Sequence, residues 1–206
     1  MNTLTGYLRQ AGTALRFLLL ATVVLGLGYP LAVFGAGQVI APYQANGSII
    51  KDPAGNPAAS TLIVQAAADK AGAQDPRWFH ARPSAVKWDP ASSSASNLGP
   101  NDPKLAEAIA ANRAAVAAAE SVPEAEVPAD AVTASGSGLD PDISPAYARL
   151  QIPRVAAAHG LSTEAVAALV SRQTSGGALA FLGQPAVNVT ALNLAVAAAS
   201  PVSAAK

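Results

Sequence analysis

The residues of this sequence that are best suited to carry out chemistry are a serine and a lysine three positions apart. Ser84-Ala85-Val86-Lys87 fits the S-x-x-K pattern of penicillin-recognising enzymes, in which the lysine lies one helical turn from a nucleophilic serine. The rest of that pattern does not follow, because the nearest approach to K-T-G, Lys70-Ala71-Gly72, precedes the serine and S-D-N is missing. A stand-alone exported serine hydrolase-like enzyme is therefore kept only as an alternative interpretation.

Two carboxylates form the second candidate. Asp140 and Asp142 flank Pro141, and such a pair serves acid and base chemistry or Ca²⁺ ligation in proteins. A turn that leads into a helix uses the same residue types, so the pair supports both interpretations. Just upstream, Ser135–Gly138 offers backbone N–H groups to an anion, but no Lys or Arg lies nearby in the sequence. A structural turn is the favoured interpretation of that stretch.

Composition argues against most other chemistries. The chain has no cysteine and only two histidines, His80 and His159, whereas a catalytic zinc site normally needs three protein ligands. Neither a phosphate-binding G-x-x-x-x-G-K-[ST] loop nor a dinucleotide-binding G-x-G-x-x-G occurs. Lys plus Arg and Asp plus Glu both number 13, so no net field attracts nucleic acid. The residues predict no catalytic centre, no metal and no nucleic acid partner.

An uncharged apolar stretch near the N-terminus places these residues at a membrane. No charged residue occurs from Phe17 to Ile50, and about twenty helical residues cross the hydrocarbon core of a bilayer. We predict a cytoplasmic N-terminal segment at residues 1–14, a transmembrane helix at 15–36, and an extracytoplasmic soluble domain at 37–206. Membrane lipid is then one of the partners.

The cations give the orientation. Arg9 and Arg16 lie at the N-terminal side of the stretch and the first cation beyond it is Lys51, so the positive-inside rule places the N-terminus in the cytoplasm. We therefore expect a single-pass protein of the inner or plasma membrane, with Pro30 kinking its helix. The alternative is a cleaved signal peptide with Gly35-Ala36-Gly37 as the cleavage site. Under both interpretations the domain lies outside the cytoplasm.

The exported part is predicted to be one α+β domain with a small sheet and several helices. Ser60–Gln65 and Ala186–Val189 are strand-like, and the sheet is expected to join these two regions. Helices are expected to begin at the capping residues Asp102, Ser144 and Ser162.

The core of this domain is predicted to be modest. Hydrophobic residues make up 51% of the chain, yet aromatic residues make up only 5%, and much of the apolar content is alanine, which buries little area. Three aromatic rings lie close together in the sequence and are interpreted as core rather than as a ligand platform: Trp78, Phe79 and Trp88.

Seven stretches distributed along the chain resemble one family of proteins. They are LGYPLAVFGAGQ (Leu27–Gln38), QANGSII (Gln44–Ile50), ARPSA (Ala81–Ala85), SNLGPNDPKL (Ser96–Leu105), VPADAVTASGSGLDPDISP (Val127–Pro145), QIPRVAAAHGLS (Gln151–Ser162) and VNVTALNLA (Val187–Ala195). In this order they are similar to the C subunits of the Kdp potassium-transporting ATPase, and together they cover most of the chain.

The resemblance implies an accessory, non-catalytic subunit of a four-chain, high-affinity, ATP-driven potassium importer. Its partners would be a channel-like potassium-translocating subunit, a P-type ATPase subunit and a small membrane subunit. The subunit would be needed for assembly and stabilisation. The family is also described as a catalytic chaperone that raises the ATP affinity of the ATPase subunit, with ATP as a transient ligand and no resident cofactor.

The predicted topology conflicts with a direct role in ATP binding. ATP is cytoplasmic, whereas the domain is expected outside. A family feature proposed to resemble the LSxxQ signature of ABC transporters corresponds here to Leu161-Ser162-Thr163-Glu164-Ala165, where Ala165 replaces the glutamine. This departure weakens the case for an ATP contact.

Structural or interface roles are expected for polar, glycine and proline residues of the resembling stretches. Glycines there permit tight backbone geometry, Asp140 is suited to bond nearby amides, and Ser144 is suited to cap a helix. The complete set of candidates is Asn46, Gly47, Arg82, Pro83, Asn97, Gly136, Gly138, Asp140 and Ser144.

Overall fold

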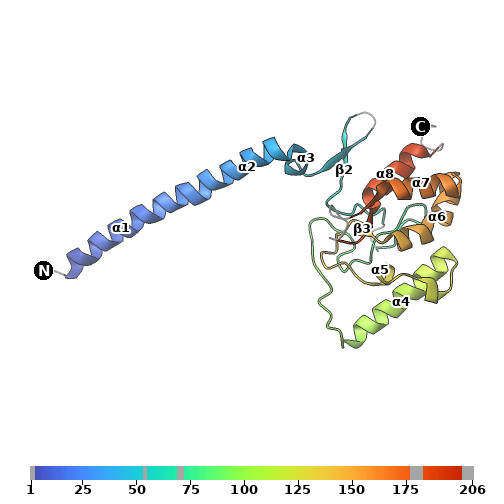
Figure 1. Cartoon of the computed structure of the whole chain (residues 1–206). Helices are drawn as coiled ribbons and strands as arrows, with labels where there is room; N and C mark the ends of the chain where they lie inside the picture. The colour runs from blue at the N-terminus through green and yellow to red at the C-terminus, as the bar shows by residue number, and fades with distance from the viewer. Residues whose placement is uncertain (1–2, 53–54, 69–71, 177–182, 201–206) are drawn as a thin grey trace. The chain divides into compact units, whose positions relative to one another are not determined.

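The computed structural model describes residues 3–52, 55–68, 72–176 and 183–200 (Figure 1). The chain divides into two compact units, Met1–Ser48 and Ile49–Lys206. The first unit is helical and the second contains both helices and small sheets, as the α+β prediction requires.

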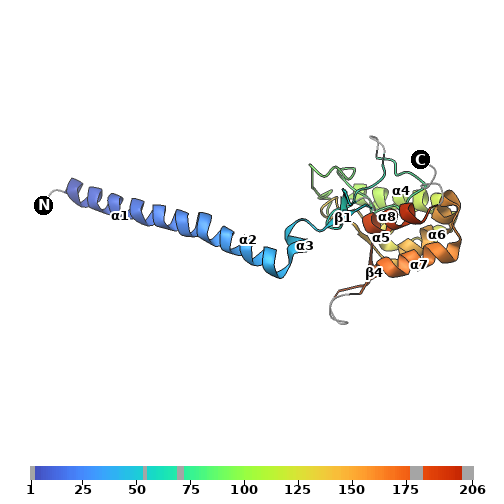
Figure 2. The ribbon, with the colours of Figure 1, turned by 90° about the horizontal axis from the view of Figure 1, so that it is seen from above.

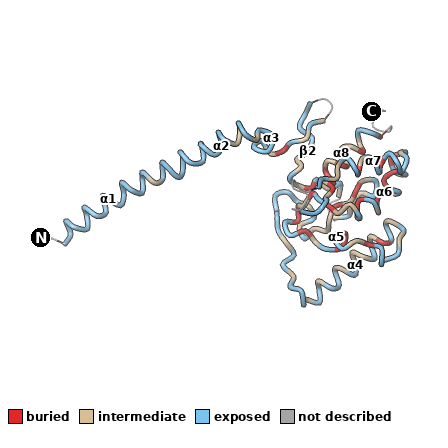
Figure 3. Tube along the Cα trace, in the orientation of Figure 1, coloured by how far each residue is buried: buried red, intermediate tan, exposed pale blue. Residues whose placement is uncertain are grey.

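The first unit is dominated by one long helical run. Helix α1 (Thr3–Val23), the π turn η1 (Val24–Gly28) and helix α2 (Tyr29–Ile40) follow one another without a break. The run contains 38 residues and is long and apolar enough to cross a membrane. No residue of its most apolar 18-residue segment is buried (Figure 3). At 1.5 Å per residue it is longer than the hydrocarbon core is thick, and longer than the predicted helix at 15–36.

The helical run continues through Pro30. Within η1 the backbone bonds reach five residues back, as in the bond from the Tyr29 N–H to the Val24 carbonyl oxygen. Proline lacks the N–H of the next helical bond, and its ring crowds the carbonyl of the preceding turn. A wider π turn directly before Pro30 is a known adaptation of a helix to such a residue.

The described residues of the second unit form two separate antiparallel sheets. Strands β1 (Ile49–Lys51) and β2 (Pro57–Ser60) form a hairpin. A second sheet has the order β3-β5-β4, in which the central strand β5 (Ala186–Asn188) pairs with β3 (Asp142–Ile143) and β4 (Thr174–Ser175).

The strand prediction was right for Ala186–Asn188 and wrong for Ser60–Gln65. The observed strand ends at Ser60, and the two predicted strands lie in different sheets. Residues 61–65 are irregular because their amides bond to distant loop and side-chain oxygens: Val64 N–H donates to the Leu139 carbonyl, and Gln65 N–H donates to Thr190 Oγ1.

The described residues of the second unit include five α-helices. They are α4 (Pro103–Glu120), α5 (Ala129–Val132), α6 (Pro145–His159), α7 (Thr163–Gln173) and α8 (Val189–Ala199), with a short 3₁₀ turn η2 (Glu124–Glu126) between α4 and α5. The predicted starts at Asp102, Ser144 and Ser162 are confirmed, since each side chain accepts a hydrogen bond from an amide of the first turn. Pro153 lies inside α6 without ending it, and Gly160 closes that helix with a left-handed φ of 63°.

The core lies where α6, α7 and α8 come together and pack against β5. Figure 2 shows the three helices. Its largest fully buried side chains are mostly valine, which buries less area than leucine or an aromatic residue. Phe79 is buried in this core and Trp78 packs against it, which confirms the prediction of a core position for two of the three rings. Trp88 is only half-buried and lines a cavity instead.

A buried ion pair connects α4, α6 and the segment before Phe79. Arg154 Nη2 lies 2.9 Å from Glu120 Oε1, and the Glu120 side chain is 1% exposed. The same guanidinium donates to the carbonyls of Pro76 and Trp78 and to Gln151 Oε1. Every nitrogen of the guanidinium thus donates to at least one oxygen.

Replacing Arg154 by methionine is expected to lower the free energy of unfolding by about 3–5 kcal/mol, because it leaves the Glu120 carboxylate buried and uncompensated. Chemical denaturation of the full chain in detergent, followed by tryptophan fluorescence, measures this change. The matched control is Arg77→Ala, which removes the exposed pair with Asp75. A loss for Arg154→Met no larger than that of the control would contradict this role.

Candidate functional site

The loop before α6 is built from its own side-chain hydroxyls. Ser135 Oγ accepts hydrogen bonds from the N–H groups of Gly138 (3.0 Å) and Asp140 (3.3 Å). Ser137 Oγ accepts from the Leu139 N–H (3.0 Å). Of the amides that Ser135–Gly138 could offer to an anion, that of Gly138 is already used by Ser135 Oγ and that of Ser135 by the Pro83 carbonyl. The geometry therefore supports the structural turn that the sequence favoured.

The segment Arg82–Ser84 fastens this loop to the domain. The Ser135 N–H donates to the Pro83 carbonyl (2.9 Å), and Ser84 Oγ donates to the Gly138 carbonyl (2.8 Å). From a third segment, the Ser94 N–H donates to the Ser137 carbonyl (2.9 Å). Residues far apart in the sequence thus hold one loop from two sides.

Ser84 has a turn-forming role. Besides donating to the loop, its Oγ accepts from the Val86 N–H (3.2 Å) and the Trp88 N–H (3.0 Å). Lys87 has a left-handed φ of 54°, so residues 84–87 form a turn and not the helical turn on which an S-x-x-K site depends. The structure gives no support to the hydrolase alternative.

Arg82 and Asp140 form an ion pair at the edge of the loop. Arg82 Nη1 lies 2.9 Å from Asp140 Oδ2, and the two side chains are 24% and 31% exposed. Arg82 also donates to the Thr133 carbonyl, while Asp140 Oδ1 accepts from the Asp142 N–H (3.0 Å). Asp140 therefore joins Arg82 to the strand that follows the loop.

The two carboxylates of the predicted pair have different surroundings. Burial, and then the charge of Asp140, raise the pKa of Asp142 above its ordinary value, while a hydrogen bond with Asn188 opposes the shift. The Asp140 carboxylate forms an ion pair with Arg82. Within the described ranges, no group of three or more His, Cys, Asp or Glu side chains is placed to hold a metal ion.

Ser144 links two helices. Its Oγ donates to Asp130 Oδ1 (2.8 Å), its N–H donates to Asp130 Oδ2 (2.7 Å), and its Oγ accepts from the Tyr147 N–H (3.0 Å). The serine thus caps α6 and ties it to α5, which carries Asp130. The role of Asp130 was not predicted, because an aspartate in a short helix carries no sequence signal for a partner 14 residues away.

The structure gathers six of the nine candidates at this loop: Arg82, Pro83, Gly136, Gly138, Asp140 and, at the end of the loop, Ser144. Asn97 has a left-handed φ of 56° and its side-chain amide donates to the Ala95 carbonyl in an exposed irregular segment. In the first unit, Asn46 Nδ2 donates to the Pro42 carbonyl and to Gln38 Oε1, and Gly47 has a φ of 82°. These two form the predicted turn, after a short helix α3 (Pro42–Ala45).

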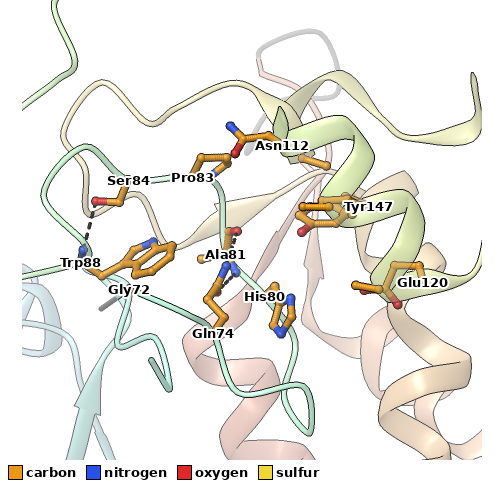
Figure 4. Close-up of a pocket in the computed structure, with 14 residues that line it drawn as sticks. Gly72, Gln74, His80, Ala81, Pro83, Ser84, Trp88, Asn112, Glu120 and Tyr147 are labelled. Carbon is orange, nitrogen blue, oxygen red and sulfur yellow. Dashed lines mark hydrogen bonds between the residues drawn. The ribbon is translucent and has the colours of Figure 1, made fainter. Parts of the chain in front are cut away.

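A cavity of about 380 Å³ lies beside the loop, between α4 and the segment that carries Trp88 (Figure 4). His80, Glu120 and Tyr147 line it. Burial and the Arg154 charge lower the pKa of His80 to about 4, so its imidazole is neutral at neutral pH. No Lys or Arg is among the described lining residues, and this cavity offers no cation to a phosphate group.

Comparison with known proteins identifies the chain. The family model for KdpC, the c chain of the K⁺-transporting ATPase, matches residues 11–198. The chain belongs to the KdpC family. A potassium-transporting ATPase KdpC subunit of Kineococcus radiotolerans is 52% identical over 200 residues, covering 96% of this chain and 98% of that protein. The KdpC subunit of Caulobacter vibrioides is 50% identical over 184 residues (88% and 89% covered), and that of Streptomyces coelicolor is 44% identical over 216 residues (95% and 96%).

The KdpC resemblance seen in the sequence is thus confirmed, and it applies to both units. The matched range includes most of the candidate membrane span as well as the loop around Gly138. The chain is therefore a KdpC subunit of a potassium-transporting ATPase with one N-terminal helix suited to a membrane.

Gly138→Ala is expected to reduce stability by about 1–3 kcal/mol, because the position requires a φ of 72° and a Cβ would lie 2.5 Å from Val86 Cγ2 and 2.8 Å from the Ser94 carbonyl oxygen. The matched control is Gly136→Ala, where a Cβ meets nothing within 4 Å. Thermal unfolding of both variants tests this. Equal loss in the two would show that the steric argument is incorrect.

Stability is expected to fall as the pH drops from about 6.5 to about 4. The unfolded chain binds a proton on His80 near pH 6.5, whereas the folded chain resists that proton down to about pH 4, so protonation favours unfolding. The full effect is at most about 3 kcal/mol. Denaturation at pH 7, 5.5 and 4 measures it, with His80→Gln as the non-titrating reference. Parallel pH profiles for the two proteins would refute the assignment.

Proposed function

We propose that this KdpC chain is an accessory, non-catalytic subunit that acts from the extracytoplasmic side of the membrane. Its domain assembles with the channel-like potassium-translocating subunit, and through it with the P-type ATPase subunit and the small membrane subunit. It stabilises the complex rather than performing a chemical step.

The observation that carries this proposal is the internal use of the loop at residues 133–144. Its hydroxyls bond its own amides, its carboxylate pairs with Arg82, and Ser144 caps α6. A catalytic site needs a nucleophile, base or ion ligand that is free to meet a substrate. Here the polar groups serve to hold a shape, which is what a docking subunit requires.

The orientation rests on the charges that flank the helix. Arg9 and Arg16 lie within the first half of the helical run, and no cation follows until Lys51. The positive-inside rule then leaves residues 1–14 in the cytoplasm and exports the domain.

The second candidate is the chaperone role, in which the chain raises the ATP affinity of the ATPase subunit. The stretch at Leu161–Ala165 would be its contact. In this stretch Ser162 Oγ is the cap of α7 and accepts from the Ala165 N–H (3.1 Å). The hydroxyl is thus committed to the helix, and we favour the accessory role from outside.

The test asks in which compartment the domain lies and which subunits co-purify with the chain. Because the chain has no cysteine, Ser92→Cys in the exposed segment before α4 provides a single reactive thiol, and Thr5→Cys provides a matched thiol on the other side. We expect a membrane-impermeant maleimide to label Ser92→Cys in intact cells and Thr5→Cys only after lysis. We expect the C-terminally tagged chain to bring the other Kdp subunits through purification. Labelling of Ser92→Cys only after lysis would favour the chaperone role instead.

A further inference from the structure

The membrane-spanning helix contains a backbone carbonyl that the helix does not satisfy. The Leu25 carbonyl could accept from the amide of residue 29 in an α-helical pattern or from that of residue 30 in a π pattern. The Tyr29 N–H is used by the Val24 carbonyl, and residue 30 is a proline without an N–H. The π turn and the proline together leave the Leu25 carbonyl without an intrahelical donor.

The surroundings of this carbonyl favour a donor from outside the helix. Leu25 is exposed and lies in the run that is apolar and long enough to cross a membrane. Hydrocarbon supplies no water to bond a free carbonyl, and such a group is strongly unfavourable there. Membrane helices tolerate proline because neighbouring helices or polar side chains satisfy the freed groups.

The helix surface next to this carbonyl is open. Gly28 lies three residues after Leu25, on the surface that flanks the carbonyl, and a Cβ there would make only an ordinary contact of 3.7 Å with the Val23 carbonyl oxygen. Ala32 and Ala36 continue the same face at four-residue spacing. Small residues at this spacing allow the backbone of a second helix to approach closely.

From this combination we infer that a transmembrane helix of a partner subunit packs on the Gly28–Ala36 face and donates a hydrogen bond from a hydroxyl or amide side chain to the Leu25 carbonyl. The inference rests on the proposed function, since the partner helix belongs to the Kdp complex. A second copy of this chain is the poorer occupant. In the parallel orientation that a common topology imposes, Val24–Leu27 of the copy would face the carbonyl, and these side chains carry no donor.

The first test replaces one glycine on each side of the helix. The tagged full chain is co-expressed with the other Kdp subunits as Gly28→Leu or as Gly26→Leu. Gly26 lies at nearly the same depth on the opposite face, where a Cβ would meet only Thr22 Cγ2 at 3.9 Å. We expect Gly28→Leu to reduce the recovered partner subunits by about tenfold or more, and Gly26→Leu by less than about twofold. Equal recovery with the two variants would overturn the assignment of the face.

The second test concerns the hydrogen bond itself. Pro30→Ala restores an N–H that can satisfy the freed carbonyl within the helix, so the partner's donor becomes redundant. We expect about threefold to tenfold less recovered partner, while the chain stays in the membrane fraction. Recovery equal to or above that of the wild type would overturn the donated bond. If the wild-type chain recovers no Kdp subunit, the proposed function is refuted, and so is the partner helix named here.

Discussion

The arrangement of the second unit depends on the charge of Arg154. Its guanidinium neutralises a glutamate with almost no exposure to water and binds carbonyls of the chain just before Phe79. Gln151, one turn earlier on α6, bonds both the N–H and the carbonyl of His80. One face of α6 therefore holds an otherwise irregular segment in place by polar contacts. A mostly aliphatic core buries too little aromatic area to fix such a segment by packing alone.

The loop around Gly138 uses the same strategy with shorter side chains. Serine hydroxyls replace the regular backbone ladder that a strand would supply, and each positions an amide of the same loop. The sequence pointed to Gly138, Asp140 and Ser144 because each has a local physical role. It could not pair Asp140 with Arg82, since that contact joins positions 58 residues apart, and no local pattern records such a distance.

The fold could be predicted where the determinants are local. Asp102 and Ser144 cap helices as expected because capping depends on the next three residues only. The prediction of a strand at Ser60–Gln65 failed because the determinants there are not local. The β-branched and aliphatic residues of this stretch match a strand, but its amides find Leu139 and Thr190, so the tertiary partners override the propensity. Hydrophobic pattern alone does not distinguish these two outcomes.

The hairpin β1-β2 begins at Ile49, nine residues after the end of the helical run at Ile40. So short a covalent connection tethers the second unit to the helix that is suited to a membrane, and such a tether raises the effective concentration of a partner held at the same membrane into about the millimolar range. Under that condition a weak contact suffices for lasting association. Among the described residues of the second unit, the large hydrophobic side chains counted as exposed are Ile49 and Leu62. A domain delivered by its anchor can therefore keep a polar surface that resists aggregation and still remain bound.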